Sequence, residues 1–149
     1  MAENLNYKVT YSYCYSESVA NCEKYGRLYT WSAAKEACPE GWHLPTNAEF
    51  ETLLKAVGGS SVAGTMLKSK KGWYDGGHGI DEYGFTVLPV GRSYSAGAFG
   101  YAGKYAAFFS ATESSEYSAY DLGLLYHYVS ASLSLSHKGR AYSVRCLRD

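Results

Sequence analysis

The sequence predicts an α+β fold in which two helices pack on antiparallel strands, with many loops and two disulfide bonds. Helical spacing of apolar residues occurs in two short segments between residues 30 and 58. Strict alternation of apolar and hydroxyl-bearing residues over 128–136 indicates a half-buried strand or hairpin. The chain has 16 tyrosines and 16 glycines among 149 residues, a composition that suits short strands and turns. We expect a single domain over 1–149, since this length suits one full-sized core.

The first elements precede residue 30. Residues 5–15 are aromatic and β-branched, which predicts an early strand. Cys14 and Cys22 enclose a short polar segment that we expect to be a loop. A local disulfide there would stabilise the fold by about 2–3 kcal/mol.

The first helix is expected after residue 30. Its apolar face repeats at helical spacing and consists of Trp31, Ala34 and Cys38. Thr30 or Ser32 can cap the N-terminus through a side-chain oxygen. Pro39 ends the helix because proline has no N–H to donate and restrains the preceding residue. Residues 41–44, GWHL, follow as a strand-like segment.

The second helix has its own start and stop signals. Thr46 and Glu49 form a capping box, in which each side chain can bond the other residue's backbone N–H. The apolar stripe comprises Phe50, Leu53, Leu54 and Val57. Gly58 and Gly59 then end the helix.

The middle of the chain is expected to be mostly irregular. Residues 65–68 predict a short strand or turn, and the apolar run 85–90, FTVLPV, predicts a buried strand. Residues 92–106 are rich in glycine, serine, tyrosine and alanine, which favours a long surface loop.

The last third is expected to form strands. Residues 107–111 predict a buried strand and 119–146 the remaining ones, with 141–147 as the closing strand. Within the alternating segment, one apolar face is expected to be buried: Val129, Ala131, Leu133 and Leu135.

Charge and hydropathy exclude some functions. With 14 basic and 14 acidic residues, net charge offers no argument for binding nucleic acid or an anionic membrane. No apolar run approaches membrane-spanning length, so no membrane insertion is expected. The start, Met1-Ala2 followed by ENLNY, looks like an expression start on an excised domain, so the chain is expected to have no signal peptide.

The four cysteines have no CxxC spacing and no histidine cluster beside them. Two disulfides are therefore favoured, in an oxidising environment such as a bacterial periplasm or cell surface. The alternative is four buried thiols in a cytosolic protein.

Three segments closely resemble the Fibrobacter succinogenes major paralogous domain, a family of bacterial surface and secreted proteins. They are residues 23–53, 79–85 and 142–149. The first and last also resemble, more distantly, the C-type lectin fold. The residues that fit that pattern are Trp31, Ala34, Cys38, Gly41, His43, Leu44, Glu49 and Cys146.

The resemblance implies a C-type-lectin-like architecture with a disulfide from Cys38 to Cys146. Such a bridge closes about a hundred residues and is worth roughly 4–5 kcal/mol. The remaining pair is then Cys14 with Cys22. The chain lacks the Glu-Pro-Asn or Gln-Pro-Asp and Trp-Asn-Asp motifs of calcium-dependent sugar-binding lectins, so sugar binding through that calcium site is not expected. The reactive cysteines of formylglycine-generating enzymes, which use the same broad fold, have no counterpart.

One metal site is considered, in the glycine-rich loop 72–85. Asp75 and Asp81 could bind calcium there, with backbone carbonyls completing the oxygen shell. The alternative is that both carboxylates bond their own backbone in Asx turns. No other cofactor is expected.

Catalysis is not expected. His43, His78, His127 and His137 are dispersed, and no serine or cysteine lies in a GxSxG elbow. His43 lies between Trp42 and Leu44, a context typical of a structural histidine.

A binding face is expected after residue 90. Tyrosine provides rigid, amphipathic contact area, and serine provides adaptable hydrogen bonds. The predicted ligand-binding residues are Tyr94, Tyr101, Tyr105, Tyr117, Tyr120, His127, Tyr128, Ser130, Ser132, Ser134, Ser136 and Arg140. The alternative is ordinary strand pairing and core packing, which we expect of Tyr126 and Tyr142.

The sequence thus predicts non-catalytic recognition of a protein or glycan ligand at a bacterial cell surface, by a monomer. One alternative is a structural or adhesive module that self-associates. Another is a diversified display scaffold of a diversity-generating retroelement. Asparagine occurs only at residues 4, 6, 21 and 47, and adenine-directed mutagenesis of asparagine codons would leave such a pattern.

Overall fold

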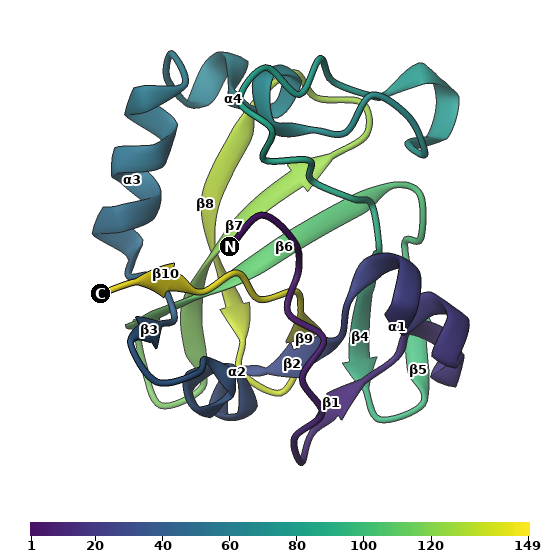
Figure 1. Ribbon diagram of the computed structural model, residues 1–149, viewed down its shortest axis with the longest axis vertical. Helices are drawn as coiled ribbons and strands as arrows, with labels where there is room; N and C mark the ends of the chain where they lie inside the picture. Colours follow the sequence, from purple (N-terminus) through teal and green to yellow (C-terminus); the bar gives the residue numbers. More distant parts are fainter.

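The computed structural model describes all 149 residues and has an α+β fold. Its centre is an antiparallel sheet in the order β6-β7-β8 (Figure 1). The strands are β6 (Tyr105–Glu113), β7 (Ser118–Leu125) and β8 (Ala131–His137). Helices α3 (Asn47–Ala56) and α4 (Ser60–Leu67) cover one face, and α2 (Trp31–Ala37) packs against the other. The sheet therefore separates two core clusters of 12 buried residues each.

A five-stranded sheet in the order β1-β2-β9-β4-β5 lies beside this centre. Its strands are β1 (Ser12–Tyr13), β2 (Leu28–Thr30), β9 (Ala141–Tyr142), β4 (Arg92–Ser95) and β5 (Ala98–Gly100). A two-stranded sheet pairs β3 (Trp42–His43) with β10 (Leu147–Arg148). The smaller helices are α1 (Val19–Tyr25), η1 (Tyr15–Glu17) and η2 (Tyr74–Gly76).

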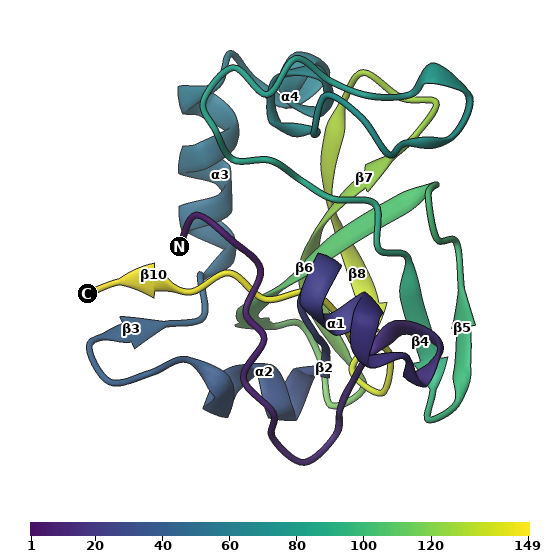
Figure 2. The ribbon, with the colours of Figure 1, turned by 45° about the vertical axis from the view of Figure 1, so that its right-hand side comes forward.

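The two ends of the chain lie close together (Figures 1 and 2). The amino group of Met1 donates to the carbonyl oxygen of Cys146 at 3.0 Å. No helix is long and apolar enough to span a membrane.

The two predicted helices are confirmed, with small differences. In α3 the Thr46 hydroxyl accepts from the Glu49 N–H and the Glu49 side chain accepts from the Thr46 N–H, so the capping box is complete. In α2 the cap is Thr30, whose hydroxyl accepts from Ala33 N–H. Cys38 lies just beyond α2 rather than inside it, because its backbone is already extended.

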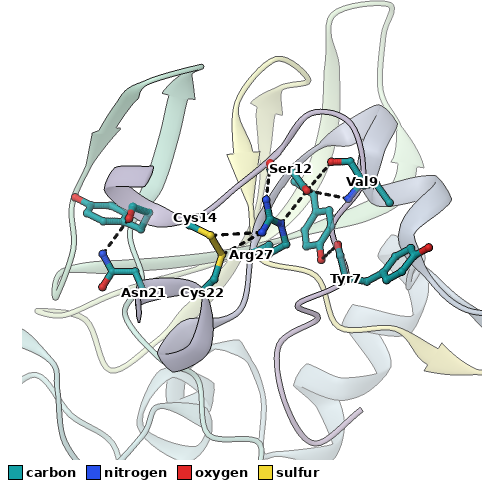
Figure 3. The surroundings of a disulfide bond; sticks show 9 residues. Tyr7, Val9, Ser12, Cys14, Asn21, Cys22 and Arg27 are labelled. Atoms are coloured by element: carbon teal, nitrogen blue, oxygen red, sulfur yellow. Dashed lines mark hydrogen bonds between the residues drawn. A yellow bond between two sulfur atoms is a disulfide. The ribbon is translucent and has the colours of Figure 1, made fainter. Parts of the chain in front are cut away.

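Both expected disulfides are present. Cys38–Cys146 spans 108 residues and joins the end of α2 to the chain leading into β10. Cys14–Cys22 spans 8 residues. Arg27 lies against this second bridge, with Nη1 3.4 Å from the sulfur of Cys14 and Nε donating to Ser12 Oγ at 2.9 Å (Figure 3). The bridge and the arginine together hold the N-terminal segment against β2.

Two expectations near the N-terminus are wrong. The segment between Cys14 and Cys22 contains η1 and the start of α1 rather than a loop. The strand predicted over 5–15 is limited to Ser12–Tyr13, because only these residues pair with β2. With α1 and α4, the fold has four α-helices instead of two.

The segment after α3 also differs from expectation. Residues 60–67 form α4, whereas a short strand or turn was expected over 65–68. The sequence does not favour a helix strongly, but packing does: a side chain at Gly64 would lie 2.4 Å from the carbonyl oxygen of Ser130. Glycine lets α4 approach the β7–β8 connection, and this close packing outweighs helix propensity.

The apolar run 85–90 is buried at Val87 and Val90 but is not a strand. Its one ladder contact joins Val87 to Lys68. Pro89 has no N–H, and Thr86 has a positive φ of 51°, so a regular ladder cannot continue.

The prediction of a long loop over 92–106 is wrong as well, since residues 92–100 form the β4–β5 hairpin. The closing strand 141–147 is divided into β9 and β10, which belong to different sheets.

The alternation in β8 is confirmed only in part. Ala131 is buried and Leu133 half-buried, but Val129 and Leu135 are exposed. Ser136, expected on the exposed face, is buried because its side chain meets the hydroxyl of Tyr142 at 2.9 Å.

Candidate functional site

Arg92, the first residue of β4, lies against three tyrosine rings. Its guanidinium carbon is 4.7 Å from the ring centre of Tyr94, 4.8 Å from Tyr101 and 5.4 Å from Tyr105. Its Nη2 lies 3.4 Å from the Tyr94 hydroxyl, while its buried Nε has no hydrogen-bond partner. We call Arg92, Tyr94, Tyr101 and Tyr105 the tyrosine–arginine patch.

Glycines at two positions allow this arrangement. A side chain at Gly100 would lie 2.9 Å from the Tyr94 ring, which packs against β5. Gly91 has a φ of 82°, and a side chain there would lie 2.4 Å from the carbonyl oxygen of Gly100. The β4–β5 hairpin therefore holds the arginine and its rings in a defined geometry.

Asp121 of β7 is the second unusual group in this region. Its side chain is fully buried, and neither carboxylate oxygen has a hydrogen-bond partner. Burial raises the pKa of Asp121, although the nearby Ser136 hydroxyl and the charges of Arg140 and Arg92 oppose the shift. Burial likewise raises the pKa of Tyr105, with the Asp121 charge among the smaller causes. Unpaired buried polar groups are rare in folded proteins and are concentrated at functional sites.

Three of the predicted serines share a sheet face with Asp121. The β7–β8 register places Ser132 opposite Gly123, Ser134 opposite Asp121 and Ser136 opposite Ala119. Because directly opposed residues point to the same side of a sheet, these side chains lie in one row. Ser132 and Ser134 are exposed, whereas Ser136 is buried.

The predicted residues thus fall into separate groups. Tyr94, Tyr101 and Tyr105 form the patch, and the half-buried Arg140 lies close enough for its charge to act on Asp121. The others are placed elsewhere and consist of Tyr117, Tyr120, His127, Tyr128 and Ser130.

Tyr117 lies in the β6–β7 turn, and Tyr120 opposes Leu135, on the opposite side of the sheet from Ser134. Tyr142 is part of the core and Tyr126 packs at its edge, as expected of both.

His127, Tyr128 and Ser130 belong to the connection between β7 and β8. The His127 ring centre is 4.1 Å from that of Tyr128 and 4.7 Å from that of Tyr126. The buried Lys68 fixes this connection, because its Nζ donates to the carbonyls of Leu125 at 3.1 Å and Tyr128 at 2.8 Å. Burial lowers the pKa of Lys68.

The glycine-rich loop shows turn geometry at Asp81. Its carboxylate accepts from the Thr86 N–H at 2.6 Å and from the Thr86 hydroxyl at 2.5 Å. Both bonds reach Thr86, five residues on, so they differ from the Asx turn that was the alternative to calcium binding, in which the carboxylate bonds its own local backbone. Asp75 is exposed within η2, and no group of three or more histidine, cysteine and carboxylate side chains is arranged to hold a metal ion.

His43 lies between two carboxylates. Its Nδ1 is 2.6 Å from Asp149 Oδ1, and its Nε2 is 3.0 Å from Glu49 Oε1. Hydrogen bonding to Asp149, and next to Glu49, raises the pKa of His43. The histidine thus connects β3 to both α3 and the end of the chain, a structural role.

Sequence reasoning missed Arg92, Asp121 and Lys68. A single charged residue inside an apolar strand, as in YDLGLL, is a usable signal for Asp121. Nothing in the local sequence marks Arg92, because its surroundings come from two strands and a turn.

The comparisons agree with the resemblance of the three sequence segments. Residues 1–148 match the family described as the Fibrobacter succinogenes major domain. No curated protein and no solved structure matches the chain significantly. Since the match covers almost every residue, the chain belongs to the Fibrobacter succinogenes major domain family.

Proposed function

We propose that this chain is a non-catalytic ligand-recognition module of a bacterial secreted or surface protein, and that it binds a protein or glycan through the tyrosine–arginine patch. The observation that carries the proposal is the environment of Arg92. Its guanidinium lies against three tyrosine rings, and its buried Nε has no hydrogen-bond partner. The buried and unpaired Asp121, which lies opposite Ser134 in the serine row, supports it.

The side chains of the patch suit binding. Tyr94 and Tyr101 are 42% and 48% exposed, so each ring keeps an open surface although it also lies against the Arg92 guanidinium. Tyrosine and arginine are the residues most enriched among those that dominate binding energy. A planar guanidinium held against rings also loses little rotational freedom when a ligand binds.

The scaffold suits binding as well. Strand β4 pairs with β9, and Phe99 of β5 packs against a small buried cluster, so the hairpin that carries Arg92 and Tyr94 is fixed to the rest of the fold. A rigid site avoids much of the entropic cost of ordering side chains on association. Two disulfides also support an oxidising compartment, hence a secreted or surface location.

The test is a binding screen of the purified domain against arrays of glycans and bacterial surface proteins. The variant Tyr94→Ser/Tyr101→Ser is expected to lose binding by about tenfold or more, because truncating a residue that dominates binding energy costs about 2 kcal/mol or more. The matched control is Tyr117→Ser/Tyr83→Ser, since these tyrosines are 65% and 59% exposed but lie outside the patch. Equal binding by wild type and the patch variant, at equal melting temperature, would refute the proposal.

A diversified display scaffold is a second candidate. It is supported by the absence of asparagine after residue 47, together with the tyrosine, serine, aspartate and histidine of the later strands. Sequencing the encoding locus tests it. A reverse transcriptase gene and a template copy with adenines at the variable codons are expected, and a locus without them would rule this candidate out.

A further inference from the structure

Strand β8 is an unprotected edge of the central sheet. It pairs with β7 on one side and with no strand on the other. Natural edge strands are usually protected by charged residues, proline or a bulge. Residues 128–136, YVSASLSLS, contain neither charge nor proline, and the β7–β8 register runs without a shift.

A groove runs beside this edge. Its volume is about 390 Å³, and it lies between β8 and the C-terminal half of α3. Leu54 forms part of its wall on the helix side together with the charged Glu51 and Lys55, and Ala131 and Leu133 form part of it on the strand side. Ala131 itself is buried, so the room for a larger side chain is the groove beside it.

Exposed apolar side chains lie along the same strand. Leu135 is 53% exposed and Val129 just before β8 is 65% exposed. Leu135 shares the helix-side face of the sheet with Ala131 and Leu133, since residues two apart along a strand point the same way. The molecule thus has both an exposed apolar side chain, Leu135, and a groove beside Ala131 that could receive such a side chain.

We propose that two copies of this chain associate by antiparallel pairing of their β8 strands around a two-fold axis at Leu133. This register places Leu135 of each copy opposite Ala131 of the other, on the helix-side face and next to the groove. It places Ser132 opposite Ser134, so hydroxyl meets hydroxyl on the other face. The two three-stranded sheets become one continuous sheet of six strands.

A second copy fits this edge because the strand is complementary to itself. The small side chain of Ala131 in one copy lies opposite the larger side chain of Leu135 in the other. The segment 128–136 carries no charge, so no like charges meet across the interface. The chain also has a formal net charge of zero, so the two copies do not repel each other at long range. This proposal replaces the expectation of a monomer and does not depend on the ligand of the tyrosine–arginine patch.

The dimer is tested by sedimentation equilibrium of the purified domain over a range of concentrations. Wild type is expected to dimerise. Leu135→Lys is expected to be monomeric at an unchanged melting temperature, because it replaces the apolar contact with Ala131 of the other copy by a charge, at an already exposed position. Val19→Lys, at a residue 69% exposed in α1, is the matched control and is expected to dimerise as wild type does.

The register is tested with single cysteines, since all four native cysteines are in disulfides. Leu133→Cys is expected to form an intermolecular disulfide on oxidation, because the two copies of residue 133 face each other across the axis. Ser132→Cys is expected not to, because it faces residue 134. A wild-type chain that stays monomeric at the highest concentration, or a dimer unaffected by Leu135→Lys, would overturn the proposal.

Discussion

Cys38 and Cys146 are joined across 108 residues of chain, and the bond ties the end of α2 to the segment that leads into β10. Cys146 is almost completely buried in the core cluster that α2 shares with the central sheet. The bond therefore closes the fold around one face of that sheet. The Cys14–Cys22 bond closes only a short loop near the surface helix α1.

The two disulfides are expected to contribute unequally to stability. In the chain-entropy model, loss of the long bridge costs about 4–5 kcal/mol and loss of the short one about 2–3 kcal/mol. Urea unfolding of Cys38→Ala/Cys146→Ala and of Cys14→Ala/Cys22→Ala measures both. A larger loss in the second variant would contradict this ranking.

The capping box of α3 is expected to matter measurably. Thr46→Ala removes the hydroxyl that accepts from Glu49 N–H and should lower the free energy of unfolding by about 1 kcal/mol. Thr52→Ala is the matched control, since Thr52 is exposed in the same helix and bonds only to the Ala48 carbonyl. The same loss in both variants would show that the cap itself adds little.

His43 is expected to titrate above its usual pKa of 6.5. Asp149 is the largest cause, so Asp149→Asn should lower the pKa of His43, as followed by NMR. Because the folded pKa is raised, this stabilisation is present below pH 6.5 and is lost as pH rises through the folded pKa.

The partner Glu49 behaves in the opposite way. Its pKa is lowered, chiefly by the Thr46 N–H, so its contribution is present above pH 4.5 and is lost as pH falls through its folded pKa. Both contributions therefore coexist between pH 4.5 and 6.5. A His43 pKa that does not move in Asp149→Asn would contradict this account.

Asp121→Asn is expected to be at least as stable as wild type at neutral pH. Burial raises the pKa of Asp121, so the favourable neutral form is lost as pH rises through the folded pKa. Asparagine stays neutral, and its advantage should shrink as wild type is acidified toward pH 4, which unfolding curves at several pH values would show. A destabilised Asp121→Asn at neutral pH would mean that the carboxylate is charged and paired with an arginine.

Elements whose ends are set by interactions between residues close in sequence were predicted correctly. The start of α3 is encoded by Thr46 and Glu49, which bond each other within one turn. Pairing of Cys38 with Cys146 came from the family resemblance, since spacing alone allows several pairings.

Elements that depend on tertiary contact were missed. Helix α4 contains Gly64, a poor helix former, and it exists because that glycine packs against the Ser130 carbonyl. The candidate site was missed for the same reason. Arg92 and Asp121 lie in different sheets, and only the folded structure shows that both have buried polar atoms without hydrogen-bond partners.

The most direct test of the central claim is a map of ligand contact by NMR. A glycan or protein that binds in the screen is titrated into labelled domain, and amide shifts are followed residue by residue. If the tyrosine–arginine patch binds the ligand, the largest shifts fall on and just after the β4–β5 hairpin, around Arg92, Tyr94 and Tyr101. Shifts confined to the β7–β8 connection at His127 or to the turn at Tyr117 would show that the ligand binds elsewhere.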